Sequence, residues 1–115
     1  MVEKILCIEF GKEGCDVCGS LKESIPKYVH NAGLDGKVEF VYYNMANPSD
    51  EAIRDALWYE IPIRDSSVPS LVVDNGREVW KKTVTYRDGK ADLITAKDIV
   101  SVLNSVKEQD ENSRV

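Results

Sequence analysis

The order of apolar and polar positions at the start of the chain predicts a buried strand followed by an amphipathic helix. The run Ile5-Leu6-Cys7-Ile8-Glu9-Phe10 is apolar except for its acid, so residues 4–10 are expected to form a central strand covered on both faces. Apolar side chains then recur at helical spacing over residues 15–30, and Asn31-Ala32-Gly33 supplies the stop. Pro26 should kink this helix, because it has no N–H to donate to the carbonyl four residues earlier.

The remainder of the chain continues this alternation of strands and helices. Residues 38–43 predict a second strand, and Asn47 followed by Pro48 is typical of a helix cap and first helical position. A third strand is predicted at 71–73 and a returning strand at 78–86. With a C-terminal helix the order is β-α-β-α-β-β-α. Its first three elements would form a parallel crossover unit and its last two strands a hairpin.

Two short motifs set the boundaries of the last elements. Asp74-Asn75-Gly76-Arg77 predicts the hairpin turn, because Asn and Gly adopt positive φ at low cost. Thr95 and Asp98 resemble a capping box, in which the side chain at each position bonds to the backbone of the other. The helix that follows has an apolar stripe formed by Ile99, Val102, Leu103 and Val106.

Length and charge are those of a soluble single-domain protein. The chain has 115 residues, and we assign residues 1–108 to one domain and 109–115 to a disordered tail. With 15 basic and 20 acidic side chains the net charge is −5, which argues against a nucleic-acid or anionic-membrane partner. No stretch approaches a transmembrane helix, and the N-terminus lacks the apolar core of a signal peptide. A monomer in a reducing cytoplasm is therefore expected.

The segment Cys15-Asp16-Val17-Cys18 carries the candidate chemistry. In a reducing compartment a CxxC pair is more often catalytic or metal-binding than structural. A thiolate is the species that attacks a disulfide, and Cys15 falls at the N-terminus of the predicted helix, where unpaired N–H groups and the dipole favour an anion. At such sites the pKa of a cysteine falls to roughly 3.5–7.5 from about 8.5. Cys18 lies one turn further in, close enough to bridge to Cys15.

These residues together resemble the thioredoxin-fold thiol–disulfide oxidoreductases, which include thioredoxins and glutaredoxins, over roughly residues 4–83. The matching segments are Ile8-Glu9-Phe10, the CxxC at 15–18, Asn44 through Asn47-Pro48, Val68-Pro69-Ser70-Leu71 and Asn75-Gly76. The resemblance implies an α/β thioredoxin-like fold whose four-stranded mixed sheet has the order 2-1-3-4 and is flanked by three helices. It implies the smaller, glutaredoxin-sized version, because there is no room for the additional N-terminal strand and helix of thioredoxins. Residues 86–93 look like an insert.

The resemblance also implies catalytic roles. Cys15 would be the nucleophile and Cys18 the resolving cysteine, with their disulfide as the redox group and with no further cofactor and no metal. In thioredoxins and protein disulfide isomerases an acid matching Glu9 lies beneath the CxxC and helps to deprotonate the resolving cysteine. Burial raises the pKa of a carboxylate, so Glu9 is expected to relay a proton for Cys18. The alternative is that Glu9 faces solvent on an edge strand.

A second set of residues is implied to bind the substrate, namely Gly14, Asp16, Val17, Val68 and Pro69. In this family the proline matching Pro69 is cis and packs against the CxxC, and the backbone of the preceding residue can pair with an extended substrate chain. The Asp16-Val17 pair departs from the Gly-Pro and Pro-Tyr pairs common in the family, and Gly14 replaces a frequent tryptophan. Because Asp16 is an anion beside the nucleophile, it should disfavour the thiolate, and we hypothesise a reducing potential.

Three functions compete on this sequence. The first is a thioredoxin-type enzyme that reduces protein disulfides and is itself reduced by a thiol reductase. The second is a glutaredoxin that uses glutathione, for which Asp88-Gly89 with Asp92 lies roughly where glutaredoxins hold the glutathione amine. The third is a non-enzymatic protein that binds a metal or cluster through the CxxC, across a dimer. Two cysteines alone are too few for a four-ligand thiolate site.

Four other residues have ordinary structural interpretations. Cys7 is expected to be a small buried hydrophobic residue. His30, the single histidine of the chain, should lie on the surface at a helix C-terminus, so no histidine-based triad or zinc cluster is expected without ligands from a partner. Trp58 and Trp80 are expected to be core residues or groove walls.

Overall fold

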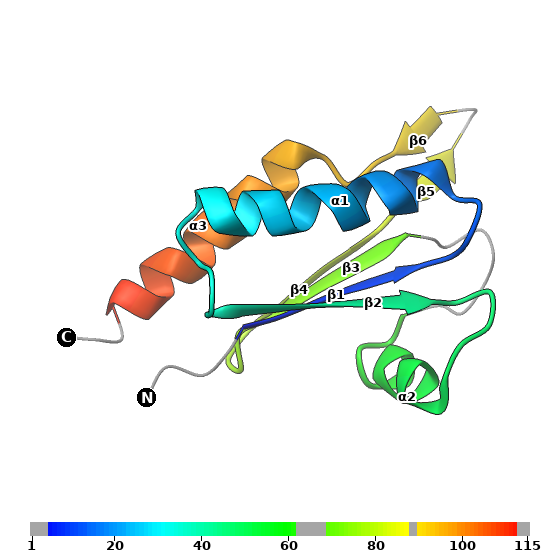
Figure 1. Ribbon diagram of the computed structural model, residues 1–115, viewed down its shortest axis with the longest axis horizontal. Coiled ribbons are helices and arrows are strands. Elements are labelled where there is room, and N and C mark those ends of the chain that lie inside the picture. Colours follow the sequence, from blue (N-terminus) through cyan, green and yellow to red (C-terminus); the bar gives the residue numbers. More distant parts are fainter. Residues whose placement is uncertain (1–4, 62–68, 88–89, 113–115) are drawn as a thin grey trace.

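The computed structural model describes residues 5–61, 69–87 and 90–112 (Figure 1). Helices and strands follow the predicted order as far as the fourth strand, after which a short hairpin precedes the last helix. The elements are β1 (Ile5–Gly11), α1 (Asp16–Asn31), β2 (Val38–Asn44), α2 (Asp50–Trp58), β3 (Ser70–Asp74), β4 (Val79–Thr83), β5 (Thr85–Arg87), β6 (Lys90–Asp92) and α3 (Ala96–Asn112).

Four strands form one mixed sheet in the order β2-β1-β3-β4, which confirms the predicted topology. β1 runs parallel to β2 and antiparallel to β3, and β3 pairs antiparallel with β4. β1 is therefore an internal strand, which explains why its sequence is almost continuously apolar. In this register Glu9 lies between Tyr42 of β2 and Leu71 of β3.

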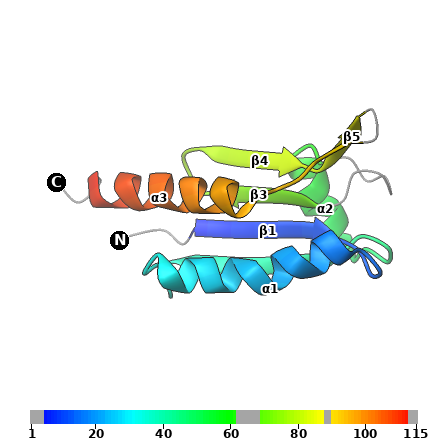
Figure 2. The same cartoon turned by 90° about the horizontal axis from the view of Figure 1, so that it is seen from above.

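Helices cover both faces of the sheet. α1 and α3 lie side by side on one face, and α2 crosses the other face near the end at which β1 finishes (Figures 1 and 2). Side chains of β1 alternate between the two layers: Ile5 and Cys7 join a cluster with residues of α1 and α3, whereas Ile8 and Phe10 join a cluster with α2. Because successive side chains of a strand point to opposite faces, Glu9 points to the side of α1.

Side-chain caps begin α1 and α3. Cys15 is the cap of α1, and Pro26 is accommodated within that helix. The predicted capping box before α3 is confirmed. The N–H of Thr95 donates to Asp98 Oδ2 at 3.0 Å, and the N–H of Asp98 donates to Thr95 Oγ1 at 3.2 Å. Each side chain thus satisfies an N–H group that the helix leaves without an internal partner.

The start of α2 differs from the prediction of a cap at Asn47 and a first helical residue at Pro48. The cap is Ser49, whose Oγ accepts the N–H of Ala52 at 3.1 Å, and the helix begins at Asp50. Serine is as favourable a cap as asparagine. The sequence therefore offered two acceptable starts, and the later one is used.

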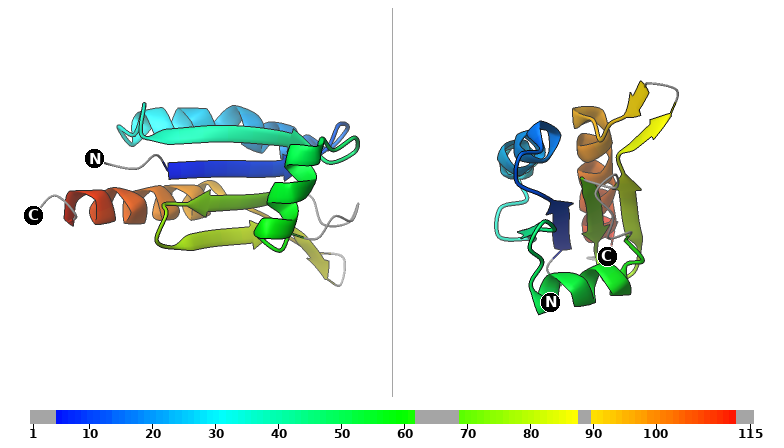
Figure 3. Two further views of the ribbon diagram at one scale, coloured as in Figure 1. Left: turned by 90° about the horizontal axis from the view of Figure 1, so that it is seen from below. Right: turned by 90° about the vertical axis from the view of Figure 1, so that its right-hand side faces the viewer.

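The predicted returning strand over 78–86 is interrupted at Val84. β4 ends at the residue before it, and β5 pairs antiparallel with β6 instead of with the main sheet. Val84 is completely buried, and its N–H donates to the carbonyl of Pro69 at 3.0 Å. The insert expected over 86–93 is therefore a two-stranded hairpin, which projects beyond the end of the sheet (Figure 3).

The last helix is longer than the sequence predicted. α3 runs to Asn112, past residue 108 at which the domain was predicted to end. Residues 109–112 are therefore helical, which corrects part of the predicted tail. Residues 113–115 lie outside the described residues, so disorder in this final segment stays a prediction.

Candidate redox site

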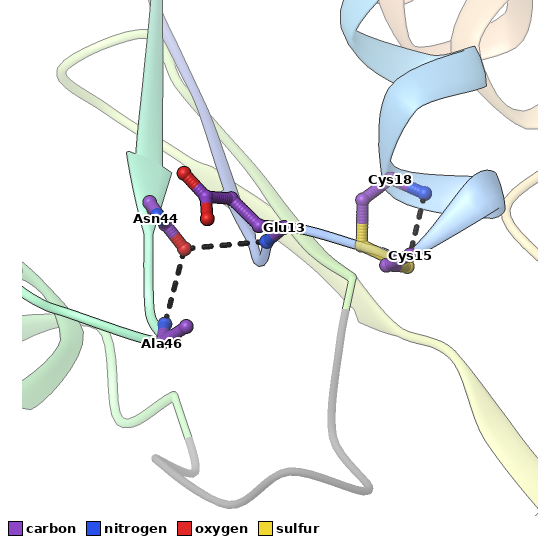
Figure 4. Close-up of a disulfide and its surroundings, with 5 residues drawn as sticks. All are labelled: Glu13, Cys15, Cys18, Asn44 and Ala46. Carbon is purple, nitrogen blue, oxygen red and sulfur yellow. Dashed lines mark hydrogen bonds between the residues drawn. A yellow bond between two sulfur atoms is a disulfide. The ribbon is translucent and has the colours of Figure 1, made fainter.

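Cys15 and Cys18 form a disulfide at the start of α1 (Figure 4). Their Cα atoms are 5.2 Å apart, as the three-residue spacing predicted. Cys15 Sγ accepts the N–H of Cys18 at 3.2 Å, and the carbonyl of Cys15 accepts the N–H of Gly19 at 3.1 Å. Cys15 is partly exposed, whereas Cys18 is completely buried. The two sulfurs therefore differ in their access to solvent and to the free N–H groups of the helix.

The loop between β1 and α1 is held against the end of β2. Asn44 Oδ1 accepts the N–H of Glu13 at 3.4 Å and the N–H of Ala46 at 3.1 Å (Figure 4). Gly14 completes the turn with a φ of 80°, a conformation that a residue with a Cβ adopts only with strain. This requirement gives a physical reason for a glycine directly before Cys15.

Glu9 is completely buried in the middle of the sheet. The alternative that it faces solvent on an edge strand is therefore wrong. Neither carboxylate oxygen has a hydrogen-bond partner within the described part of the chain. Burial raises the pKa of Glu9 to about 8, and the positive charge of Lys22 lowers it in part. The carboxyl group is thus poised to gain or lose a proton close to neutral pH.

Tyr42 and Cys18 both pack against Gly11, which lies two residues after Glu9 in β1. A Cβ atom at Gly11 would lie 2.9 Å from Tyr42 Cε2 and 3.0 Å from Cys18 Cβ, so glycine is required for the close approach. The ammonium group of Lys22 lies 4.5 Å from the centroid of the Tyr42 ring, a cation–π contact. Sequence reasoning missed both Lys22 and Tyr42, although the four-residue spacing of Lys22 from Cys18 placed the two on one helix face.

A groove with a volume of about 300 Å³ begins beside the disulfide and follows α1 toward the start of α3. Its walls are mostly apolar, and Asp16, which is charged and exposed, lies next to Cys15 at the end nearest the disulfide. The lining residues are Asp16, Val17, Ser20, Leu21, Ser24, Tyr28, Leu93, Ile94 and Ile99. Two of the predicted substrate-binding residues, Asp16 and Val17, therefore border a groove that could receive an apolar side chain.

The proline predicted to face the CxxC lies at the correct end of the sheet. Pro69 is buried and directly precedes β3, where Ser70 pairs with Phe10 near the end of β1. This register brings Pro69 to the edge from which the CxxC loop departs. Val68 lies outside the described residues, so the conformation of the Val68-Pro69 bond and the pairing of this backbone with a substrate stay predictions.

The other residues that the sequence singled out lie apart from the disulfide. Cys7 is buried, as expected, and burial raises its pKa to about 12. His30 is exposed and its Nδ1 lies 2.8 Å from Asp35 Oδ2. Trp80 packs partly buried against the core. Trp58 is 78% exposed at the end of α2 and is therefore not a core residue, but it lines a surface cavity, in agreement with the groove-wall alternative.

Across residues 5–61, 69–87 and 90–112, no three His, Cys, Asp or Glu side chains are grouped so that they could hold a metal ion. Over the same ranges, no helix has the length and apolar character needed to cross a membrane.

Comparison with known proteins identifies the fold. No protein-family model matches the chain, and no curated protein matches it. Among solved structures, chloroplastic thioredoxin z has a TM-score of 0.61 and 16% identity, over 92% of this chain and 80% of the other. Thioredoxin-2 of the malaria parasite has a TM-score of 0.61 and 11% identity, over 91% and 85%. Malassezia sympodialis thioredoxin has a TM-score of 0.55 and 19% identity, over 90% and 76%.

The TM-scores establish similarity of fold, whereas identities this low leave the activity to be argued from the residues. The thioredoxin z and thioredoxin-2 structures superpose on 92% and 91% of this chain. The chain is a thioredoxin-fold protein with a CxxC disulfide at the start of its first helix.

Proposed function

We propose that this protein is a thiol–disulfide oxidoreductase that reduces protein disulfides through Cys15 and Cys18. The observation that carries the proposal is the asymmetry of the pair. Cys15 is partly exposed and receives an N–H at the start of α1, whereas Cys18 is completely buried. A nucleophile must meet the substrate, while a resolving thiol need only reach the nucleophile, so unequal exposure suits the two roles.

In the first step the Cys15 thiolate of the reduced protein attacks a substrate disulfide. A bond forms between Cys15 Sγ and one substrate sulfur, and the substrate S–S bond breaks. Its electron pair leaves on the second substrate sulfur, which takes up a proton from solvent. The N–H of Cys18 and the first turn of α1 stabilise the attacking thiolate, because both direct positive charge toward Cys15 Sγ.

In the second step Cys18 resolves the mixed disulfide. Its thiol transfers a proton to the carboxylate of Glu9, and the resulting thiolate attacks Cys15 Sγ. The Cys15–Cys18 bond forms, the bond to the substrate breaks, and the substrate leaves as a second thiolate, so that two electrons have passed to it. Glu9 suits this role because burial raises its pKa to about 8, close to that of a thiol.

Substrate recognition is proposed to involve the surface around the disulfide. Gly14, Asp16 and Val17 border it on one side, and Pro69 with Val68 would form the facing wall. The groove beside Val17 would take an apolar side chain that lies next to the substrate cysteine. The proposed setting is a monomer in a reducing cytoplasm, with a disulfide-containing protein and a thiol reductase as partners, without nucleic acid or membrane.

Asp16 supports a reducing potential. It is exposed in the first turn of α1, directly after the nucleophile, where its negative charge opposes a thiolate at Cys15. A less stable thiolate makes the reduced form a better electron donor. Equilibration with a glutathione redox buffer tests this. A potential near that of thioredoxin, about −270 mV, would support it, and a value near the −120 mV of a strong oxidant would contradict it.

The proposed activity is tested with two recycling systems and a protein disulfide such as that of insulin. We expect NADPH with thioredoxin reductase to sustain reduction of the disulfide, and glutathione to sustain it much less. Cys15→Ser should abolish turnover in both systems. If neither system supports turnover by the unaltered protein above the rate of the reductants alone, the proposed function is wrong.

The glutathione-dependent alternative makes the opposite prediction in this assay. Asp92, which was expected near the glutathione amine, has its carboxylate 3.3 Å from Lys82 Nζ and is thus already engaged. Asp88-Gly89 lies outside the described residues.

The metal-binding alternative has its own test, because a CxxC site shared across a dimer would give metal in elemental analysis and a dimer in solution.

A further inference from the structure

The carboxyl group of Glu9 has an unusual neighbour on the next strand. Tyr42 is its partner in the parallel register of β1 and β2, so the two side chains leave the sheet on the same face. The Tyr42 ring reaches across Gly11 toward Cys18, where a Cβ on Gly11 would lie 3.0 Å from the tyrosine hydroxyl oxygen. The Tyr42 ring therefore packs against β1 at Gly11, close to Cys18 in the first turn of α1.

A cation reaches the same place from α1. Lys22 lies one helical turn after Cys18, so it follows Cys18 on the same helix face. Its ammonium nitrogen is 4.5 Å from the centroid of the Tyr42 ring. Lys22 is exposed, and the attraction of the ring for a cation favours this rotamer over the others that its side chain can adopt. The positive charge is thus held over the strand next to Glu9.

The other titratable groups around Glu9 leave this role to Lys22. Those on this face of the sheet, in the preceding loop and on the covering helices include Cys7, Cys18, Tyr42, Lys82, Lys12, Glu13, Asp16, Glu23, Lys27, Tyr28, Asp92 and Asp98. Among the cations it is Lys22 whose charge lowers the pKa of Glu9. The positive charge of Lys82 is balanced by two carboxylates, because its Nζ lies 3.0 Å from Asp98 Oδ2 and 3.3 Å from Asp92 Oδ1. Cys7 stays a neutral thiol at pH 7, since burial raises its pKa to about 12.

Glu9 needs such a charge if it is to act as a base. A carboxylate that is buried without a hydrogen-bond donor is costly to ionise, so it stays protonated, and a protonated acid cannot accept a proton from Cys18. Burial raises the pKa of Glu9 and Lys22 lowers it, to a net value of about 8. At neutral pH roughly a tenth of the molecules would then carry the carboxylate.

We propose that Lys22, held over the ring of Tyr42, is a positioning residue whose ammonium stabilises the ionised carboxylate of Glu9 while Cys18 gives up its proton. This inference rests on the proposed oxidoreductase function. In the step concerned, the Cys18 S–H bond breaks and its proton passes to Glu9, while the electron pair stays on sulfur and forms the bond to Cys15. Lys22 exchanges no proton and contributes only its charge.

The electrostatic half of the proposal is tested in the oxidised protein, where no catalysis is needed. The Glu9 carboxyl carbon is followed by ¹³C NMR as pH is varied, and its signal is assigned by its loss in Glu9→Gln. We expect Lys22→Met to raise the midpoint by roughly half a unit to one unit. Lys22→Arg should restore it, and Lys27→Met, a charge removal elsewhere on α1, should leave it unchanged. An unchanged midpoint in Lys22→Met would overturn the proposal.

The catalytic half is tested by the pH profile of mixed-disulfide resolution. In Lys22→Met the pH at which the resolution rate begins to rise should be higher, by the same number of pH units as the NMR midpoint. In a Glu9→Gln background Lys22→Met should have no effect on the profile. If Lys22→Met slows resolution equally at every pH, or still shifts the profile without Glu9, the assigned role is wrong.

The ring is tested separately from the charge. Tyr42→Phe keeps the aromatic face and should retain the midpoint of Glu9 within a few tenths of a unit. Tyr42→Leu removes the face and should raise the midpoint in the same direction as Lys22→Met, provided that the circular dichroism spectrum is native. A raised midpoint in Tyr42→Phe equal to that in Tyr42→Leu would show that the hydroxyl, and not the held cation, acts on Glu9. If the NMR results hold but protein disulfides are not reduced, only the proposed function fails.

Discussion

The backbone N–H of Cys18 donates a hydrogen bond to Cys15 Sγ at 3.2 Å, so the same sulfur both caps α1 and takes part in the disulfide. A capping position directs the unpaired N–H groups of the first helical turn at the capping atom. When the disulfide is reduced, those groups favour negative charge on Cys15 over Cys18. The order of attack in the proposed mechanism follows from this asymmetry.

Serine substitution of each cysteine should therefore have different consequences. Cys18→Ser removes the resolving thiol and should leave the substrate covalently attached to Cys15, so mixed disulfides accumulate. Cys15→Ser should trap almost none, because the remaining thiol is completely buried. Non-reducing electrophoresis after incubation with a protein disulfide, followed by mass spectrometry, measures both. Equal trapping by the two variants would contradict the assignment of roles.

Ionisation of Glu9 should make the oxidised protein less stable as pH rises. Its pKa is 4.5 in an ordinary setting and about 8 in the folded protein, so the unfolded state loses the proton first. The penalty is absent below pH 4.5 and grows up to pH 8. Glu9→Gln should consequently stabilise the oxidised protein at pH 7 by on the order of 3 kcal/mol, with little effect at pH 4. Denaturant unfolding measured across this pH range tests it, and a gain that does not depend on pH would count against a buried, titrating acid.

Alanine substitutions at Gly11 and at Gly19 should change the stability of the protein in opposite directions. A Cβ at Gly11 would lie within 3.0 Å of Tyr42 and Cys18, so Gly11→Ala should destabilise the protein by about 1–3 kcal/mol and displace Tyr42. Gly19 lies in α1 with nothing within 4 Å of the corresponding point. Gly19→Ala should therefore stabilise the helix by roughly 0.5–1 kcal/mol. Urea midpoints of both oxidised variants check the pair, and a neutral Gly11→Ala would show that the packing is looser than described.

The groove beside the disulfide should matter for protein substrates alone. Leu93 lies on its wall and is 40% exposed. Leu93→Ser should lower kcat/KM for a protein disulfide about three- to tenfold, since one aliphatic contact is worth roughly 1 kcal/mol. The rate with a small aromatic disulfide that cannot fill the groove should not change. Val100→Ser removes a similarly exposed apolar residue of α3 outside the groove and serves as the control. Equal losses in the two variants would remove the groove from substrate binding.

The sequence was sufficient for the features that depend on local pattern. The apolar run around Glu9 indicated an internal strand, and the spacing of Cys15 and Cys18 indicated a bridge at a helix start. The Thr95–Asp98 motif marked the beginning of α3. In each case the responsible interaction spans four residues or fewer, or depends only on alternation along one strand.

Features that depend on contacts between distant segments could not be read in advance. The residue opposite Val84 in the β3–β4 register is Pro69, fifteen residues earlier. Pro69 accepts the N–H of Val84 but has no N–H to donate in return, so the pairing of β4 stops here, and nothing in the local sequence of the strand indicates this. Lys22 and Tyr42 meet only because α1 packs over β2. A large apolar side chain such as Trp58 could be expected in the core or in a groove wall, and only the structure shows that it is 78% exposed at the end of α2 and lines a surface cavity.

Transfer of electrons from the dithiol to a protein disulfide is the most direct test of the central claim. The reduced protein is mixed with an equal amount of a substrate that contains one disulfide, with no other reductant present, and both are analysed by mass spectrometry and peptide mapping. We predict that the substrate gains two hydrogen atoms, that Cys15 becomes linked to Cys18, and that Cys7 stays a free thiol. A substrate that stays oxidised while Cys15 and Cys18 stay reduced would contradict the claim that this protein is a thiol–disulfide oxidoreductase.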